Sequence, residues 1–139
     1  MARRASFSLD ITKFVEKAGD RADLVVRKVA LDLFSKVVLK TPVDTGRARG
    51  HWTAGVNHAP AGLTGRLDKS GAGAIAGIAA TVSTARAGDS IYLANNLPYI
   101  VRLEYGHSKQ APAGMVRTTI DEFQAAVNRA AAEAQRERP

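Results

Sequence analysis

Residue types that can do chemistry are sparse in this sequence, and their spacing matches no catalytic or metal-binding pattern. The three histidines, His51, His58 and His107, do not pair at the helical spacings of common metal motifs, and no cysteine adds a thiolate ligand. No serine stands in a G-x-S-x-G nucleophile elbow. Glu104 is the best candidate for a perturbed carboxylate, yet one carboxylate does not make an acid–base pair. The sequence therefore predicts no enzyme, no metal site and no cofactor.

Two patterns are similar to phosphate-binding loops but have the wrong neighbours. The spacing Gly71-x-Gly73-x-x-x-Gly77 departs by one residue from the dinucleotide fingerprint, and no buried strand precedes it. Lys69-Ser70 is similar to the end of a phosphate loop, but Asp68 stands where that loop needs glycine. We dismiss a nucleotide site on both counts.

The densest run of unusual residues lies between Leu93 and Arg117. Aromatic residues are not expected in a solvated linker, because apolar surface left in water loses about 25 cal/mol of stabilisation per Å². We interpret the run as an ordered unit that positions a surface. Its distinctive residues are Pro98, Tyr99, Glu104, Tyr105, Gly106, Pro112 and Gly114.

Composition favours a single domain over residues 1–139. Hydrophobic residues make up 45% of the chain, but many are alanines, so the core should be thin. No window reaches the roughly 18 apolar residues of a membrane span. No apolar segment follows the basic residues near the N-terminus, so a signal peptide is not expected. These features favour a soluble protein made in the cytoplasm.

The formal net charge of +7 suits a polyanionic partner such as DNA. However, the basic residues are spread from Arg3 to Arg138 rather than concentrated in one block. We therefore favour a solvated basic surface over sequence-specific readout of DNA.

A long helix is expected from Asp10 to Lys40, because apolar residues recur there at steps of three and four from Ile11 to Val37. Ser8 or Asp10 can cap its start, and Gly19-Asp20 can kink or split it. Thr41-Pro42 should end it, since a residue before proline avoids helical geometry.

The middle of the chain should alternate turns with short elements. Pro42, Asp44 and Gly46 favour a turn, followed by a strand through about Val56. Trp52 fits either a subunit contact or the core at the start of that strand. The remaining expectations are a long Gly-rich loop at Asn57–Gly73, a helix at Ala72–Ala85, a turn at Arg86–Ser90, a strand at Ile91–Ala94, a turn at Asn95–Pro98, and a short helix or strand at Tyr99–Leu103.

The last helix should begin at a capping box, Thr119-Ile120-Asp121-Glu122. An apolar stripe supports it: Val116, Ile120, Phe123, Val127, Ala131 and Ala134. The expected fold class is α+β, with a long N-terminal helix and a C-terminal helix packed on a small, mainly antiparallel sheet.

Two separated motifs carry a family resemblance. The first is Thr41-Pro42-Val43-Asp44-Thr45-Gly46-Arg47, soon followed by Trp52. The second combines Asn95-Asn96-Leu97-Pro98-Tyr99, Leu103-Glu104-Tyr105-Gly106-His107-Ser108 and Met115-Val116-Arg117. In this order, between a long first helix and a last helix, they resemble the neck or tail-completion (head–tail joining) proteins of long-tailed bacteriophages and prophages. The chain departs from many members at His107, where they have threonine.

The resemblance implies a structural virion protein rather than an enzyme. Such proteins form a ring, commonly a hexamer, that completes the tail and joins it to the head, with DNA passing through the channel. The implied partners are further copies of the chain, head-completion or connector proteins, tail terminator or tube proteins, and DNA through non-specific contact. The residues implied at subunit contacts or in structural motifs are Thr41, Pro42, Asp44, Gly46, Arg47, Trp52, Pro98, Tyr99, Glu104, Tyr105 and Gly106.

Two alternatives remain at this point. One is a tail terminator or other tail subunit, and the other is a free basic protein that binds nucleic acid. We also expect Tyr99, Glu104 and Tyr105 to form a fixed unit with the Thr41–Arg47 turn, because both segments are rich in turns and follow apolar elements that must share one small core. Arg47, Arg102 and Arg117 compete as partners of Glu104.

Overall fold

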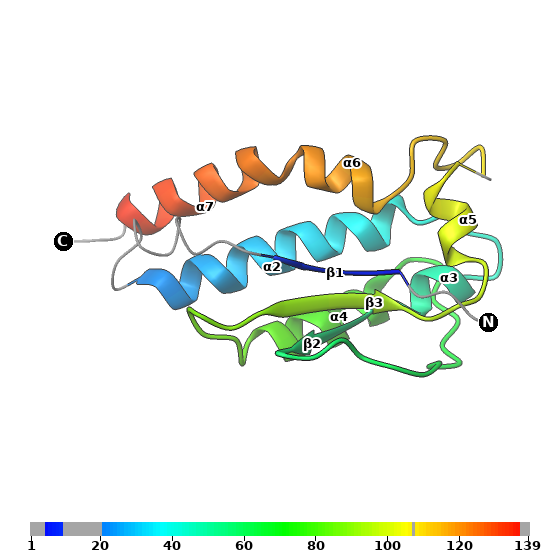
Figure 1. Ribbon diagram of the computed structural model, residues 1–139, viewed down its shortest axis with the longest axis horizontal. Coiled ribbons are helices and arrows are strands. Elements are labelled where there is room, and N and C mark those ends of the chain that lie inside the picture. Colours follow the sequence, from blue (N-terminus) through cyan, green and yellow to red (C-terminus); the bar gives the residue numbers. More distant parts are fainter. Residues whose placement is uncertain (1–4, 10–20, 107, 137–139) are drawn as a thin grey trace.

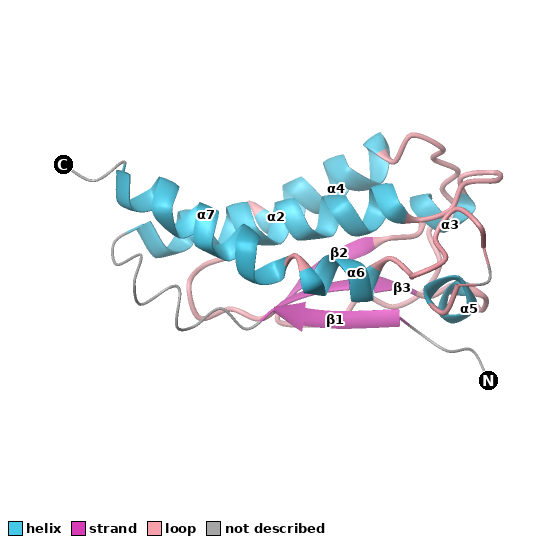
Figure 2. Ribbon diagram, turned by 90° about the horizontal axis from the view of Figure 1, so that it is seen from above, coloured by secondary structure: helices cyan, strands magenta, loops and turns pink. Residues whose placement is uncertain are grey.

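Helices packed on one face of a small antiparallel sheet make up the fold, which is of the α+β class (Figures 1 and 2). The computed structural model describes residues 5–9, 21–106 and 108–136. In chain order the elements are β1 (Ala5–Leu9), α2 (Ala22–Lys40), α3 (Arg47–Gly50), β2 (Thr53–Val56), α4 (Ala72–Val82), β3 (Ile91–Asn95), α5 (Ile100–Glu104), α6 (Val116–Asp121) and α7 (Phe123–Arg136).

The sheet has the order β1-β3-β2, with both outer strands antiparallel to β3. Ile91 and Leu93 of the central strand are buried, and Ala54 of β2, the register partner of Leu93, packs against the core. Strand β1 was not predicted. Its Ser8 pairs in register with Tyr92 of β3, so the expectation that Ser8 caps a helix was wrong.

Helix α2 supplies the largest share of the core. Its buried face carries Val25, Val26, Val29, Ala30, Leu33, Phe34, Val37 and Val38. The described part of the expected long helix is thus confirmed, whereas residues 10–20, with the possible kink at Gly19-Asp20, lie outside the described residues. Thr41 has an extended backbone, so the helix ends before Pro42 as predicted.

Helix α4 and the elements after it follow the expected order. Ile78 is buried on α4, and Tyr99–Leu103 resolves into the short helix α5. The predicted start of the last helix was wrong, because α6 already begins at Val116. Thr119 is buried and its hydroxyl donates to the carbonyl of Met115 at 2.7 Å, so it does not cap a helix. Ile120, expected in the apolar stripe, is 52% exposed.

Among the described residues, no helix combines the length and the apolar character needed to cross a membrane.

Candidate interaction surface

Thr41 and Trp52 tie the first motif to the core. The Trp52 indole is 1% exposed and donates from Nε1 to the Thr41 hydroxyl at 2.8 Å. That hydroxyl donates in turn to the carbonyl of Val37 at 2.7 Å, in the last turn of α2. Of the two readings of Trp52, the core is therefore the one that the structure supports.

Gly46 occupies a position that only glycine fits. Its φ is +88°, and a Cβ there would lie 2.6 Å from the backbone nitrogen of Lys69. Its carbonyl accepts from the backbone nitrogens of Gly50 at 2.9 Å and Asp68 at 3.0 Å. The turn therefore packs directly against the segment before α4. Arg47 begins α3 at once, so the predicted strand starts only at Thr53.

Arg49 fastens the same region, and sequence reasoning gave it no role. Its guanidinium donates to three carbonyls: those of Leu39 at 2.7 Å, Thr41 at 2.9 Å and Lys69 at 2.7 Å. A cation at the carbonyl end of α2 is favoured by the helix dipole. An arginine soon after a proline-terminated helix was the only signal available in the sequence.

Asp68 caps the start of α4. Its Oδ2 accepts from the backbone nitrogen of Ala74 at 2.8 Å, and its Oδ1 accepts from that of Gly71 at 3.1 Å and from the Ser70 hydroxyl at 3.3 Å. These bonds, led by the one from Ala74, lower the pKa of Asp68 from its ordinary value. Asp68, the residue that departs from the phosphate-loop pattern, thus places its carboxylate at the helix N-terminus, where a phosphate binds in such a loop.

Glu104 is the buried carboxylate of the second motif, with 8% of the residue exposed. Oε1 accepts from the backbone nitrogens of Met115 at 3.0 Å and Val116 at 2.8 Å. Oε2 accepts from Arg117, both from its backbone nitrogen at 2.9 Å and from Nε at 3.1 Å. Glu104 thereby joins α5 to the start of α6.

Arg117 is the charged partner of Glu104, rather than Arg47 or Arg102. Its guanidinium also donates to the carbonyl of Glu104 and lies 4.7 Å from the centre of the Tyr105 ring. Tyr105 itself is 68% exposed. Gly106 follows with φ +89°, where a Cβ would lie 2.6 Å from the carbonyl oxygen of Pro112.

Two amide side chains connect the regions of the two motifs: Gln110, which lies between two segments of the second motif, and Asn95, which begins it. The Gln110 amide accepts from the backbone nitrogen of Val43 at 2.8 Å and donates to its carbonyl at 3.0 Å. The buried Asn95 donates to the carbonyl of Ala48 at 2.8 Å and accepts from the backbone nitrogen of Leu97 at 3.2 Å. Sequence reasoning singled out neither side chain in this role.

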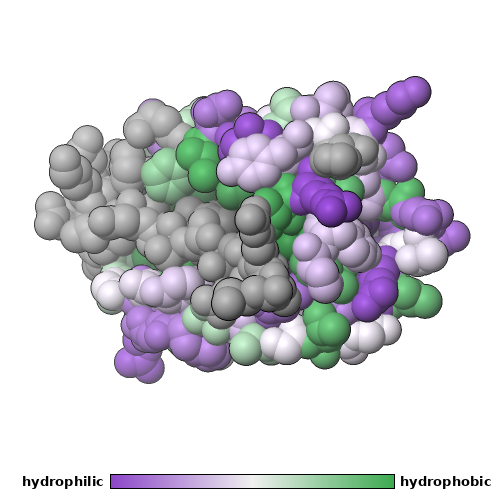
Figure 3. Space-filling view, turned by 45° about the vertical axis from the view of Figure 1, so that its right-hand side comes forward, coloured by the Kyte–Doolittle hydropathy of each residue, from purple (hydrophilic) through white to green (hydrophobic). Residues whose placement is uncertain are grey.

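A shallow groove of about 250 Å³ lies where the motifs meet. Its walls include Asp44 and Arg47 from the first motif and Tyr99 and Leu103 from the second. Tyr99 is therefore next to the turn as expected, whereas Glu104 and Tyr105 form a separate unit with Arg117. Figure 3 brings this end of the molecule forward and shows hydrophilic residues beside small hydrophobic patches.

The predicted site residues thus fall into two groups. Thr41, Pro42, Gly46, Trp52 and Glu104 are buried. Asp44, Arg47, Pro98, Tyr99 and Tyr105 are exposed, and Gly106 is half-buried. Within the described ranges, no three His, Asp or Glu side chains gather closely enough to hold a metal ion. The site is a fixed surface that carries charged, amide and phenol groups.

Comparison with protein-family models, with curated proteins and with solved structures finds no match.

Proposed function

We propose that the chain is a structural subunit of a long-tailed bacteriophage virion that completes the tail and joins it to the head. In this role it forms a ring, as a hexamer, around the DNA channel. Its protein partners are other copies of the chain, head-completion or connector proteins, and tail terminator or tube proteins. It is made in the host cytoplasm and ends in the neck or tail of the virion.

The observation that carries the proposal is the meeting of the two motifs. They are separated by about fifty residues in the sequence, yet both motifs line one groove, and Gln110, which lies between two segments of the second motif, bonds to the backbone of Val43. Motifs that served only local turns would not need to share a surface. Their joint position supports a role for the whole end in assembly.

The division between buried and exposed motif residues supports the same role. The Thr41–Trp52 bond and the Glu104 bonds fix the backbone, while Arg47, Tyr99 and Tyr105 remain exposed on it. Tyrosine and arginine on a rigid support are the residues that most often dominate protein–protein contacts. This arrangement suits a subunit that meets neighbours in a fixed geometry.

Assembly of the purified chain tests the proposal. Light scattering should give a mass several times the 14.8 kDa of the subunit, and negative-stain images should show closed rings. The variant Tyr99→Ala should shift the mass toward the monomer while keeping the circular dichroism spectrum of the folded subunit. The matched control Arg86→Ala, on the turn before β3, should assemble like wild type.

A chain that stays monomeric at every concentration, and that fails to join tails or heads added to it, would contradict the proposal. A tail terminator or other tail subunit is the alternative within the same class. Antibody labelling of virions tests for a tube subunit, because a completion protein lies at the head–tail junction and a tube subunit lies along the tail.

A further inference from the structure

One end of the molecule has more basic than acidic residues. The two segments that build the α3–α5 end, residues 41–71 and 97–117, contain seven Lys and Arg against three Asp and Glu, a net charge of +4 out of +7 for the chain. The seven are Arg47, Arg49, Arg66, Lys69, Arg102, Lys109 and Arg117. Lys and Arg are no denser in these segments than in the rest of the chain, so the excess of positive charge comes from the small number of acids.

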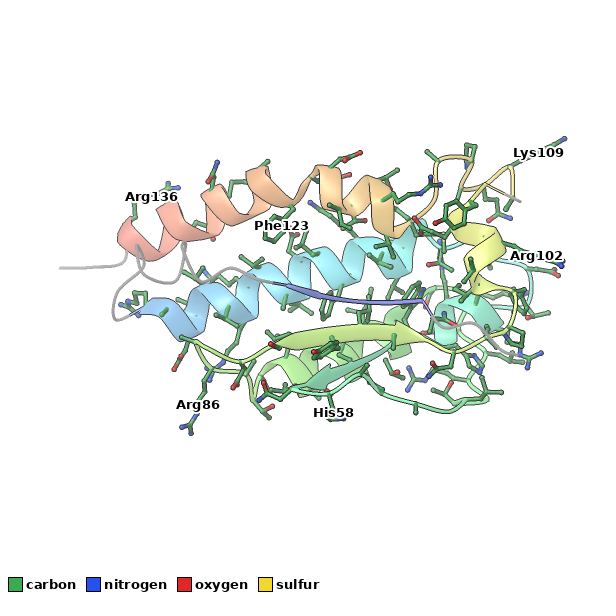
Figure 4. The ribbon with its side chains drawn as sticks, viewed as in Figure 1. His58, Arg86, Arg102, Lys109, Phe123 and Arg136 are labelled. Atoms are coloured by element: carbon green, nitrogen blue, oxygen red, sulfur yellow. The ribbon has the colours of Figure 1, made fainter. Side chains whose placement is uncertain are left out.

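Four of these cations are free to meet a ligand. Arg47, Lys69, Arg102 and Lys109 are exposed, and their side chains make no hydrogen bond or ion pair with the described part of the chain. Arg47 borders the groove, Lys109 lies between the groove residues Ser108 and Gln110, and Lys69 adjoins Gly46. Figure 4 shows Arg102 and Lys109 projecting outward from this end. We refer to the four residues as the basic end.

The acids nearby do little to neutralise the basic end. Asp68 is occupied by backbone N–H groups at the start of α4, and Glu104 is buried against α6 and Arg117. Among the described residues of these two segments, Asp44 is the one exposed acid. The surface potential there is consequently positive.

We propose that the basic end binds the phosphate backbone of duplex DNA without reading its sequence. Long, unpartnered Lys and Arg side chains spread over a surface suit phosphates that repeat along a strand, because each cation can release one condensed counterion. An acidic protein would instead favour a compact, preorganised pocket with bidentate arginines. The inference deepens the proposed function, because it names the end of the subunit that faces the DNA in the channel.

Salt dependence measures the contact directly. Fluorescence anisotropy with a labelled duplex of random sequence should show affinity falling by roughly 10²-fold between 50 and 200 mM salt, as expected for about four phosphate contacts. Two duplexes of unrelated sequence should bind equally. The variant Arg102→Glu/Lys109→Glu should weaken binding by at least about 10-fold and reduce the salt slope by roughly two.

The matched control is Arg86→Glu/Arg136→Glu, which changes the net charge equally but at positions away from the basic end (Figure 4). It should change affinity by less than about 3-fold. Equal losses in the two variants would show that only net charge matters and would overturn the inference. Polyglutamate that competes as well as duplex DNA would overturn it in favour of an acidic protein partner. Melting temperatures of both variants confirm that they are folded.

Ring formation separates this inference from the proposed function. Rings that form but bind DNA no better than the basic-end variant would overturn the inference and leave the proposed function standing. A chain that binds DNA through the basic end but never forms rings would support the inference and contradict the proposed function.

Discussion

Glu104 and Asp68 use their carboxylates in the same way, by accepting backbone N–H groups at the start of a helix. Such groups have no partner within the helix, and the helix dipole favours a negative charge beside them. Glu104 reaches α6 from α5, and Asp68 reaches α4 from the preceding loop. Helix capping therefore explains the positions of both carboxylates.

Replacing Glu104 by alanine should destabilise the chain by about 3–5 kcal/mol, because it leaves three backbone N–H groups and a guanidinium without their acceptor. Urea unfolding followed by circular dichroism gives the free energy. Glu133→Ala is the control, since Glu133 forms an exposed ion pair with Lys28 and its replacement should cost under about 1 kcal/mol. Equal stabilities of the two variants would mean that Glu104 is an ordinary surface acid.

Asp68 should make stability fall in acid. Its pKa is lowered in the folded state, so its contribution is present above the ordinary value of 3.8 and is lost as the pH falls through the lower folded pKa. Asp68→Asn should therefore be less stable than wild type at pH 7, with a difference that shrinks below about pH 4.

Unfolding free energies at intervals from pH 7 to pH 2 check this, with the exposed Asp44→Asn as control. A constant difference across the whole range would argue against capping by the Asp68 charge. Asp89 and Glu122, whose pKa values are also lowered, remain in both proteins and do not affect the comparison.

At the scale of elements, the spacing of apolar residues predicted the helices and strands that bury a single face. The apolar steps of α2, the end at Thr41-Pro42 and the buried strand at Ile91 are all present in the structure. Strand β1 was missed because it is short, carries two serines and pairs with a strand far along the chain. A local pattern holds no information about such a partner.

The capping box at Thr119 failed for a related reason. The local residues are of the types that cap a helix, but the helix begins three residues earlier, at Val116, where Glu104 of α5 caps it. The site shows the same limit. The position of Tyr99 beside the Thr41–Arg47 turn was predictable, because both segments are rich in turns and share one small core. The choice of Arg117 over Arg47 as partner of Glu104 depends on where α5 places the carboxylate.

Val29 tests the buried face of α2. It is 1% exposed, so Val29→Asp would bury an unpaired charge and should cost about 3 kcal/mol or more. Leu39→Asp, at a position 51% exposed near the end of the same helix, should cost less than about 1 kcal/mol. Thermal melts compare them, and a Val29→Asp variant that melts like wild type would refute the assigned face.

At the scale of the whole molecule, the Gly-rich loop is held by backbone hydrogen bonds at its ends and by side-chain hydrogen bonds in its middle. Asn96 donates to the carbonyls of Pro60 at 3.2 Å and Gly62 at 2.9 Å, and the Thr64 hydroxyl donates to a carbonyl of α3. Asn57 donates to the carbonyl of Ser90 at 2.6 Å, and Asp68 donates to that of Gly46 at 3.0 Å. Between them, the amides of residues 61–64 donate no hydrogen bond within the described chain, and Leu63 and Leu67 are 57% and 66% exposed. Apolar side chains left in water suggest a surface that a neighbour covers.

Hydrogen exchange should therefore differ between the free and assembled states. We expect residues 61–64 to exchange rapidly in the free subunit and to become protected in the ring. The amides of Asp68 and Gly71 are internal controls, because they are already bonded within the subunit. Strong protection of residues 61–64 in the free monomer would show that the loop needs no neighbour.

The pairing of β1 with β3 also sets an order of events on the ribosome. Ala5 pairs with Asn95, so the sheet closes a loop of about 90 residues, and the first strand must wait until most of the chain has emerged. The β2–β3 ribbon can form earlier across a shorter loop. Until β1 arrives, the free edge of β3 exposes unpaired backbone groups that another nascent chain can capture. Translation speed and the spacing of ribosomes on the message thus bear on how much of this protein reaches its folded state.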